Sequence, residues 1–334
     1  MEHIVGVVRS IFTDNKCLEC TVMSKENSQV IKVTNNVIGF VGLGKMGGGM
    51  VQNLISKGVQ VAVFDKNRES QILSQKVGAQ VFDSAAELVQ AVSIVFLCLP
   101  FRPEIDDVLF GENGIVSASK KNILIVDTST IYFNDAQDFE EKLLKYDIRY
   151  VDCPISGLPK RAKNGSLTMM FGGSVSDYNL VCPYLKLMGS FIIHCGDCGT
   201  GQLMKAFNNA LYNINIAAMS EMLPLAVKAG LNFNHIAKMF MSGSSRSFAS
   251  EHFLPKIMEG EFKGDYSMGD AYKDIENVKR AIQNVSLELP LFDGMVKPEA
   301  HGCPPPPNLS AICATLYFAS LDRSETAHSP FIKL

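Results

Sequence analysis

A cluster of glycines between two short apolar runs constrains the fold of this chain more than any other feature. Residues 37–43 and 59–64 are apolar runs of strand length, and the segment between them carries Met46, Met50 and Leu54 at helical spacing. A strand, a helix and a second strand in this order predict a βαβ unit, whose two strands lie parallel in one sheet. The alternation continues along the chain, which favours a doubly wound parallel sheet.

The glycine turn in residues 42–47 matches G-x-G-x-x-G. Absent Cβ atoms allow a tight turn, close approach of a pyrophosphate and close packing of helix on strand. The pyrophosphate then meets the N–H groups and the positive dipole end of the helix. A turn built for packing alone has the same spacing, so the flanking strand and helix decide for a dinucleotide site. The cofactor-binding residues expected here are Gly42, Leu43, Gly44, Lys45, Met46 and Gly47.

Asp65 stands at the end of the second apolar run, where a carboxylate accepts hydrogen bonds from the adenosine ribose of a dinucleotide. Its charge would repel a 2′-phosphate, so the sequence predicts NAD as the cofactor, with NADP as the alternative. Lys66 and Arg68 weaken this preference, because cations attract a 2′-phosphate. An acid that only forms a turn after a strand is the structural alternative for Asp65.

Further strands and helices follow in alternation. Ser84 and Glu87 have the spacing of a capping box at the start of a short helix, and residues 94–99 and 123–126 are apolar runs of strand length. Ligands of doubly wound sheets bind beyond the carboxyl ends of the strands. The residues expected to contact the cofactor at these ends are Leu99, Pro100 and Thr130.

Composition places the chain among ordinary globular proteins. Its 334 residues suffice for two domains, each with its own core. With 47% hydrophobic residues, 19% charged residues and a net charge of -3, it has no electrostatic bias toward nucleic acid or anionic membranes. No apolar run reaches the roughly 18 residues that a membrane span requires. We therefore expect neither nucleic acid nor a membrane as a partner.

The location is predicted to be cytoplasmic. Residues 1–36 mix acidic and basic side chains, which argues against a signal or transit peptide. Nine cysteines, an odd number in a long chain, are typical of thiols in a reducing compartment. Cys17 with Cys20 and Cys195 with Cys198 form two C-x-x-C pairs. The pairs are far apart in the sequence, so no metal site is expected.

Four segments carry a stronger signal than glycine spacing alone. They are FVGLGKMGGGM from residue 40, DCPISGLPKRAKNGSLTMMFGG from residue 152, GTGQLMKAFNNALYNINIAAMSEMLPLAVKAG from residue 199, and YKDIENV from residue 272. Their order and composition resemble the β-hydroxyacid dehydrogenases, the family of 3-hydroxyisobutyrate dehydrogenase and tartronate semialdehyde reductase.

The resemblance implies an α/β fold, in which an N-terminal Rossmann domain with a doubly wound parallel sheet precedes an all-α second domain. We expect residues 37–198 to be the NAD(P)-binding domain and residues 199–298 to be the helical substrate and dimerisation domain. Residues 1–36 are an N-terminal extension that matches no recognised pattern. Residues 299–334, which include four consecutive prolines, diverge from the family.

The resemblance also implies an active site in the cleft between the two domains. Lys205, in the match to G-x-G-x-x-x-K-x-x-x-N, would be the catalytic acid/base, and Asn209 would help to hold the substrate. Ser156 and Gly157 would bind the substrate carboxylate through a hydroxyl and a backbone N–H. Lys273 would lie near the nicotinamide, and we place it with the cofactor-binding residues.

Plainer interpretations of the same residues compete with these roles. A Lys beside two Asn is usually on a solvated helix face, P-I-S-G is a common turn, and a Lys-Asp pair is usually a surface ion pair. Oxidation of an alcohol nevertheless needs a base, and a Lys with the ordinary pKa of about 10.4 needs burial to act as one near neutral pH. The apolar neighbours of Lys205 suit such burial.

One departure from the family pattern bears on the substrate. Leu158 replaces the second glycine of the family's S-G-G, so the backbone there is expected to approach the substrate differently. Lys160 and Arg161 follow at once, and Arg246 lies in the helical domain. One of these cations would bind a second anionic group on the substrate, or all three are surface cations.

Together these observations predict an NAD(P)-dependent oxidoreductase that transfers a hydride between nicotinamide and a small β-hydroxy acid or its semialdehyde. The expected substrates are of the 3-hydroxyisobutyrate, glycerate or tartronate semialdehyde type. From the resemblance we also expect a homodimer or homotetramer. A catalytically silent cofactor-binding interaction module is the alternative, although retention of the expected catalytic lysine and substrate-binding residues argues against it.

Overall fold

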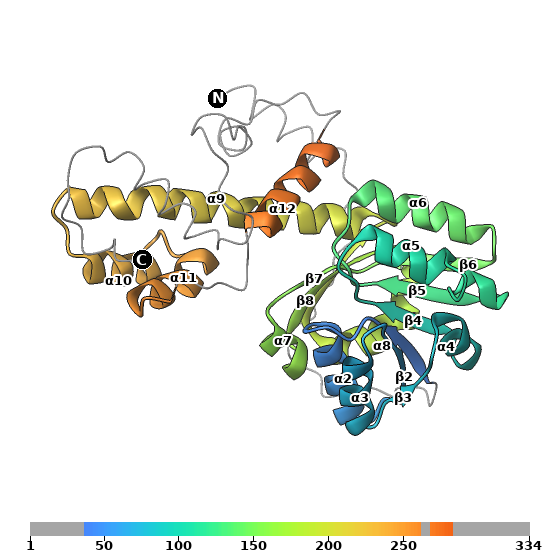
Figure 1. The fold of residues 1–334 in the computed structure, drawn as a ribbon. Coiled ribbons are helices and arrows are strands. Elements are labelled where there is room, and N and C mark those ends of the chain that lie inside the picture. Colours follow the sequence, from blue (N-terminus) through green and yellow to red (C-terminus); the bar gives the residue numbers. More distant parts are fainter. Residues whose placement is uncertain (1–36, 262–267, 283–334) are drawn as a thin grey trace. The chain divides into compact units, whose positions relative to one another are not determined.

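The computed structural model describes residues 37–261 and 268–282, drawn as coloured ribbons in Figure 1. The predicted N-terminal extension, with Cys17 and Cys20, and the divergent segment 299–334 lie outside the described residues. The chain divides into two compact units, the first ending at Gln202 and the second beginning at Leu203.

Within the described residues, nine strands form one sheet in the first unit. The strands are β1 (Ile38–Val41), β2 (Val61–Phe64), β3 (Gln80–Val81), β4 (Ile94–Leu97), β5 (Ile123–Asp127), β6 (Ile148–Asp152), β7 (Ile155–Ser156), β8 (Leu167–Gly172) and β9 (Gly189–Gly196). Their order is β3-β2-β1-β4-β5-β6-β8-β7, and β9 pairs with β8. The strands from β3 to β6 are all parallel, which confirms the predicted doubly wound α/β fold.

Helices connect and cover these strands. They are α2 (Gly47–Ser56), α3 (Arg68–Lys76), α4 (Ala85–Ala91), α5 (Arg102–Phe110), α6 (Phe133–Leu144), α7 (Pro159–Asn164) and α8 (Val175–Met188), with a 3-10 turn η1 (Val116–Ala118). The sequence places the early strands and α2 correctly, because each is a short apolar run or an amphipathic segment bounded by glycine.

The predicted capping box at α4 is half present. Ser84 Oγ accepts a hydrogen bond from Glu87 N at 3.0 Å, as the spacing predicts. The reciprocal bond differs, because Glu87 Oε2 accepts from Asp83 N, one residue earlier than a capping box requires.

Alternate residues of each strand point to opposite faces of the sheet, and helices cover both faces. In β4, Phe96 packs in one core with residues of α2 and α8. Val95 and Leu97 pack in a second core with residues of α4, α5 and α6. The strand runs are apolar throughout because both faces are buried, as in other parallel sheets.

The strand pairing changes from parallel to antiparallel after β6. β8 runs antiparallel to both β6 and β7, and β9 returns parallel to β8 with two register irregularities. The family motif that starts at Asp152 spans this change of direction. Its turn between β7 and β8 contains Gly157 and α7.

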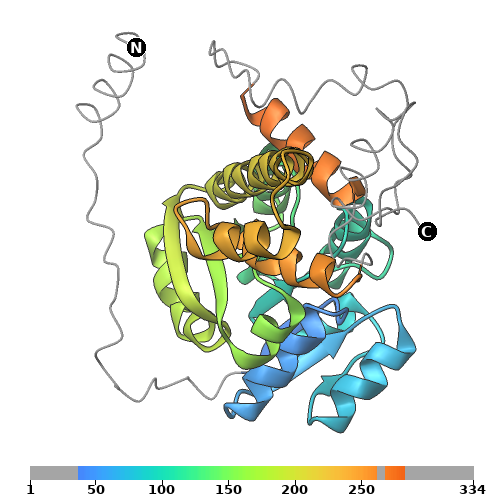
Figure 2. The ribbon, with the colours of Figure 1, turned by 90° about the vertical axis from the view of Figure 1, so that its left-hand side faces the viewer.

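The second unit is helical. The long helix α9 (Thr200–Lys228) begins in the first unit and continues through the second, where α10 (Phe233–Ser242), α11 (Phe248–Met258) and α12 (Met268–Ala281) follow. One side of α9 packs Ile216, Met219 and Leu223 against α10 and α11. Figures 1 and 2 both show these three helices side by side. The predicted order of a Rossmann domain and then a helical domain is confirmed.

None of the helices in the described residues combines the length and the apolar character that crossing a membrane requires.

Candidate active site

The three glycines of the turn after β1 have different surroundings. Gly42 has a φ of +94°, and a Cβ on it would lie 2.3 Å from the carbonyl oxygen of Cys98. A Cβ on Gly47 would lie 1.9 Å from the carbonyl oxygen of Gly42. A Cβ on Gly44 would meet no atom within 4 Å. Packing therefore requires the first and third glycines, whereas the second leaves an open surface that a ligand can approach.

The first turn of α2 presents the positive end of its dipole at this open surface. The helix begins at Gly47, and neither a side-chain cap nor an acidic residue of its own neutralises that first turn. Leu43 is buried, whereas Gly44 and Lys45 are exposed and Met46 is half-buried. A phosphate at this place finds N–H donors and a favourable dipole, and the Cβ position of Gly44 has no atom within 4 Å among the described residues. The residues fit the pyrophosphate of a dinucleotide.

Asp65 follows β2 beside this turn. Its Oδ2 accepts a hydrogen bond from Leu43 N at 2.5 Å, and its Oδ1 accepts from Asn67 N at 2.7 Å. The carboxylate thus ties the glycine turn to the end of β2. Each carboxylate oxygen has a second lone pair, so these bonds leave acceptors for ribose hydroxyls.

The two cations that follow Asp65 have carboxylate partners. Lys66 Nζ lies 2.8 Å from Asp107 Oδ2, and Arg68 Nη1 lies 3.3 Å from Asp83 Oδ1. All four side chains are more than half exposed, so these pairs contribute little to stability. They nevertheless place a negative charge beside each cation, which weakens the attraction for a 2′-phosphate.

The predicted contacts after β4 and β5 lie at the same edge of the sheet. β1, β4 and β5 are parallel neighbours, so their carboxyl ends lie together. Leu99 N donates to Ser129 Oγ at 2.8 Å, which joins the loops after β4 and β5. Leu99 and Thr130 are half-buried and Pro100 is exposed. The structure thus gathers the predicted dinucleotide residues of the first unit along one edge, where the strand order reverses at β1.

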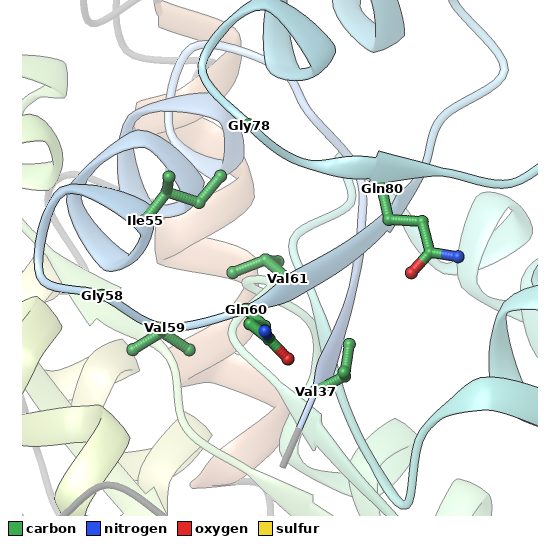
Figure 3. A pocket seen from close by; sticks show the side chains of 8 residues that line it. All are labelled: Val37, Ile55, Gly58, Val59, Gln60, Val61, Gly78 and Gln80. Atoms are coloured by element: carbon green, nitrogen blue, oxygen red, sulfur yellow. The ribbon is translucent and has the colours of Figure 1, made fainter. Parts of the chain in front are cut away.

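A hollow in the first unit lies elsewhere (Figure 3). It is lined by side chains that include Val37, Val59, Gln60 and Gln80. Val37 and Gln60 precede β1 and β2, so the hollow lies at the amino ends of these strands. The described residues that line it include no titratable group, and the glycine turn lies at the opposite strand ends. We therefore exclude this hollow as the cofactor site.

The predicted substrate turn begins at Ser156, which lies opposite Thr168 in the antiparallel pair of β7 and β8. Gly157 follows with a φ of +145°, and a Cβ there would lie 2.9 Å from Leu167 Cδ2. Both residues are half-buried. Leu158, where the family has its second glycine, has a φ of −92° and precedes α7 as its N-cap. Its backbone is ordinary, so the fold does not require glycine at this position.

The three cations considered for a second anionic group differ in their settings. Lys160 is exposed. Arg246 is exposed in the second unit and forms an ion pair with Glu251. Arg161 is half-buried, and its Nε donates to the carbonyl oxygen of Ser166 at 2.7 Å. Only Arg161 has a guanidinium that the chain holds beside the substrate turn.

Asp152 is a buried carboxylate that sequence reasoning did not single out. It is 0% exposed, and it accepts hydrogen bonds from Gly199 N at 2.6 Å and Gln202 N at 2.7 Å. These donors belong to the first turn of α9 and the residue before it, so Asp152 caps the helix across 47 positions of sequence. Burial raises the pKa of Asp152 to about 7, although the two backbone donors oppose the shift.

Gln202 adds a second connection at the start of α9. Its Nε2 donates to the carbonyl oxygen of Ser129 at 2.8 Å, and its Oε1 accepts from Ile131 N at 3.2 Å. Gln202 is 2% exposed. The loop that carries Thr130 is therefore bonded on both sides of that residue to the first turn of α9. The only sequence signal for this connection is the family segment itself.

Lys205 lies one turn further along α9, in the second unit. It is half-buried, while Asn209, four residues on, is 9% exposed and accepts from Asn208 Nδ2 at 3.1 Å. Ala206 and Ala210 on the same helix pack against Ile275 and Val278 of α12. Lys205 and Asn209 are four residues apart and share a helix face. Asn209 is buried, so this face is not the fully solvated one that a surface lysine would occupy.

α12 brings further polar residues into the helical core. Asp274 and Asn277 are each 5% exposed, and Asn277 Oδ1 accepts no hydrogen bond within the described residues. Burial and the charge of Asp274 raise the pKa of Tyr212. Lys273 lies in α12, but its side chain is outside the described residues. Asp274 and Asn277 belong to the YKDIENV segment. The family resemblance gives the Asp of this segment a supporting role in the cleft, whereas no sequence signal pointed to Asn277.

The described cysteines and histidines make separate contacts. Among the described residues, no group of three or more His, Cys, Asp or Glu side chains is placed to hold a metal ion. Cys198 Sγ donates to the carbonyl oxygen of Ala136, and His194 Nε2 lies 2.6 Å from the carbonyl oxygen of Gly173. Cys195, the other half of the C-x-x-C pair, is half-buried.

Two family models match nearly all of the described residues. Residues 37–196 match the NAD binding domain of 6-phosphogluconate dehydrogenase. Residues 199–296 match the model for NAD-binding of NADP-dependent 3-hydroxyisobutyrate dehydrogenase. The two matches meet near the start of α9.

Two relatives show extended similarity. The chain is 37% identical over 222 residues to the probable mitochondrial 3-hydroxyisobutyrate dehydrogenase of Dictyostelium discoideum, covering 66% of this chain and 69% of that protein. It is 34% identical over 255 residues to 2-(hydroxymethyl)glutarate dehydrogenase of Eubacterium barkeri, covering 76% of this chain and 85% of that protein. Because the first relative is named as mitochondrial, the cytoplasmic location stays a prediction.

A solved structure has the same fold. The 3-hydroxyisobutyrate dehydrogenase of Mycobacterium tuberculosis, solved with L-serine, matches with a TM-score of 0.75 and 26% identity. The match covers 85% of this chain and 99% of that one. The fold, the order of the motifs and the dinucleotide edge therefore all match those of 3-hydroxyisobutyrate dehydrogenase-like proteins.

Proposed function

The chain belongs to the β-hydroxyacid dehydrogenase family, and we propose that it interconverts a small β-hydroxy acid and its semialdehyde with Lys205 as the general acid/base. The family is NAD(P)-dependent, and the dinucleotide edge of the first unit fits that cofactor. The observation that carries the proposal is on α9, where half-buried Lys205 and buried Asn209 share one face. Asn209 lies one helical turn from Lys205, and the lysine is only partly exposed to solvent.

The proposed chemistry assigns one task to each group. The nicotinamide, when bound, supplies the acceptor for the hydride that leaves the hydroxyl-bearing carbon. Lys205 Nζ takes the hydroxyl proton, so the alcohol loses two hydrogens and becomes the aldehyde. In the opposite direction the protonated Lys205 returns that proton to the carbonyl oxygen. Asn209 supplies an amide that orients the hydroxyl.

Ser156 and Gly157 are proposed to hold the substrate carboxylate. A hydroxyl and a backbone N–H are neutral donors, so they orient the anion without competing with Lys205 for charge. The strand pairing of Ser156 with Thr168 fixes the start of the turn, and Leu167 and Arg161 pack close to Gly157. This rigidity favours a fixed position for the reacting carbon.

NAD is the proposed cofactor in preference to NADP. Asp65 is held beside the glycine turn, and the two nearby cations each have a carboxylate partner. A 2′-phosphate would therefore meet a fixed negative charge, while Lys66 and Arg68 are each already paired with a carboxylate.

The proposal also includes self-association through the helical unit. Met204, Phe207 and Leu211 lie at positions i, i+3 and i+7 of α9 and are 42%, 48% and 60% exposed. Three large apolar side chains on one exposed helix face are typical of a surface that another subunit covers.

The decisive test measures reduced-nicotinamide absorbance with NAD and NADP over a panel of hydroxy acids and their semialdehydes. The panel contains 3-hydroxyisobutyrate, 2-(hydroxymethyl)glutarate, glycerate, 4-hydroxybutyrate, threonate and serine. Lys205→Ala is expected to reduce kcat by about 10²- to 10⁴-fold, the usual contribution of a general acid/base. Lys228→Ala, at the exposed end of the same helix, is the matched control and should retain full activity.

Two results would contradict the proposal. Turnover that survives unchanged in Lys205→Ala would remove the lysine from the mechanism. Demonstrable NAD binding without turnover of any substrate would favour the catalytically silent module instead.

A further inference from the structure

We propose that Arg161 selects substrates with a second carboxylate, so that the natural substrate is a β-hydroxy dicarboxylic acid or its semialdehyde. This inference rests on the proposed function, in which Ser156 and Gly157 hold the first carboxylate. Arg161 follows the substrate turn and has no role in the proposed mechanism.

Arg161 packs directly against the substrate turn. A Cβ on Gly157 would lie 3.2 Å from both Cβ and Cδ of Arg161, so the aliphatic stem covers that glycine. The guanidinium continues toward β8, where Nη2 lies 3.5 Å from Thr168 Oγ1. Thr168 is the strand partner of Ser156. Opposite residues of an antiparallel pair share one face of the sheet, so the guanidinium lies beside the face that carries Ser156.

The guanidinium is held by neutral acceptors. Its Nε donates to the carbonyl oxygen of Ser166, and its second bond goes to a threonine hydroxyl. Several other cations of the first unit form ion pairs with carboxylates. Among the described residues they are Lys66, Arg68, Arg102, Lys121, Lys142, Lys145 and Arg149. Arg161 takes part in none of these pairs, although it is half-buried. Its charge is therefore balanced by no carboxylate of the described chain.

A half-buried guanidinium that no carboxylate of the described residues pairs with favours an anionic ligand. Two of its five N–H groups are used by the bonds to Ser166 and Thr168, which leaves three donors in a planar fork. Such a fork matches a carboxylate, and the fixed stem reduces the entropy lost on binding. The first carboxylate already has donors in Ser156 and Gly157, so the arginine is placed for a second one.

The neighbouring cations provide matched comparisons. Lys160 and Lys163 flank Arg161 on α7, and both are exposed. They contribute the same charge to the local potential but are not held against the turn. If the substrate binds Arg161 specifically, only substitution of Arg161 should weaken binding. If the positive charge of α7 merely attracts anions, substitution of any of the three cations should weaken binding equally.

Two substrates isolate the second carboxylate. 3-Hydroxyisobutyrate and 2-(hydroxymethyl)glutarate share a hydroxymethyl group and a carboxylate on one carbon, and they differ where a methyl group is replaced by a carboxyethyl group. Initial rates with both are measured for the wild type, Arg161→Ala, Arg161→Lys, Lys160→Ala and Lys163→Ala, using the full chain. Circular dichroism and the melting temperature verify that each variant folds.

The expected result is a change in one substrate only. The wild type should have a kcat/KM at least about tenfold higher for the dicarboxylate, and Arg161→Ala should raise the KM for that substrate about 10- to 100-fold. The KM for 3-hydroxyisobutyrate should change less than about threefold. Arg161→Lys should restore part of the dicarboxylate preference, and the two flanking lysine variants should retain it.

Other outcomes overturn the inference. Equal rises in KM for both substrates would mean that Arg161 serves the common carboxylate or only supports the turn. An unchanged dicarboxylate KM in Arg161→Ala would remove the arginine from recognition.

A calorimetric titration separates this inference from the proposed function. If no substrate is turned over, both acids are titrated against wild type and Arg161→Ala in the presence of NADH. Tighter binding of the dicarboxylate that is lost in the variant supports the arginine subsite even then. Equal affinities for the two acids would overturn it, whatever the result with Lys205→Ala.

Discussion

Gly44 and Gly47 show that neighbouring glycines of one motif meet different physical demands. A Cβ on Gly47 would overlap the carbonyl oxygen of Gly42, whereas a Cβ on Gly44 would enter open space. A sequence pattern gives both positions equal weight. The structure assigns one to the fold and leaves the other for the ligand.

This difference predicts opposite effects of the same substitution. Gly44→Ala should change the free energy of unfolding by less than about 0.5 kcal/mol, as expected for a surface change away from packed atoms. It should weaken NADH binding at least about tenfold, because the added methyl group occupies the approach of the pyrophosphate. Gly47→Ala should destabilise the fold by about 1–3 kcal/mol through overpacking. Urea unfolding and a fluorescence titration with NADH measure the two effects.

A second prediction at this scale concerns Asp65. Replacing it with Ala should lower the ratio of kcat/KM for NAD to that for NADP by at least about tenfold, because the charge that repels a 2′-phosphate is removed. The substitution also removes the bond to Leu43 N, so activity with both cofactors should fall. The ratio isolates the charge effect. Lys66→Ala and Arg68→Ala should leave this ratio nearly unchanged, and a strong change in either would show that the cations decide the preference.

At the scale of elements, the start of α9 depends on Asp152. The carboxylate accepts bonds from Gly199 N and Gln202 N and is surrounded so closely that a Cβ on Gly201 would lie 2.7 Å from its Oδ2. Lys205 follows one turn later on the same helix. The proposed catalytic lysine is thus carried by a helix whose first turn is bonded to the end of β6.

Burial of Asp152 predicts a specific pH dependence of stability. Its pKa is about 7 in the folded chain, raised by burial from the model-compound value of 3.8. The folded state therefore binds this proton more tightly than the unfolded state. Its stabilising contribution is complete below pH 4 and is lost as the pH rises toward 7, by at most about 1.4 kcal/mol per pH unit.

Asp152→Asn tests this dependence because an amide does not titrate. The difference in unfolding free energy, wild type minus variant, should fall between pH 5 and pH 7 and become constant above pH 8. Titrating groups remote from this site occur in both proteins and largely cancel in the difference. Buried Asp127 is coupled to Asp152, because its charge raises the pKa of Asp152. Parallel curves for the two proteins would mean that Asp152 ionises in the folded chain as it does in the unfolded one.

At the scale of the whole molecule, the exposed side chains of α9 predict self-association. Phe207 and Leu211 stand one turn apart on the helix and are about half exposed. Leu211→Glu should shift the mass measured by light scattering toward that of a single chain, because a buried carboxylate in an apolar interface is strongly unfavourable. Leu231→Glu, an exposed leucine in the turn between α9 and α10, is the matched control. A monomeric wild type would contradict the proposed oligomer.

The sequence by itself determined the alternation of strands and helices, the dinucleotide turn and the family. These features depend on local patterns: apolar runs of strand length, glycines at fixed spacing and four motifs in order. Tertiary structure alone decided the partners of individual side chains. Asp152 bonds Gln202 of α9 across 50 positions of sequence, and Asp65 bonds Leu43 across 22. Arg161 bonds nearby Ser166 and Thr168 only because the chain reverses between β7 and β8. Burial and hydrogen bonding are properties of neighbours in space, and these neighbours exist only once the sheet has brought distant strands together.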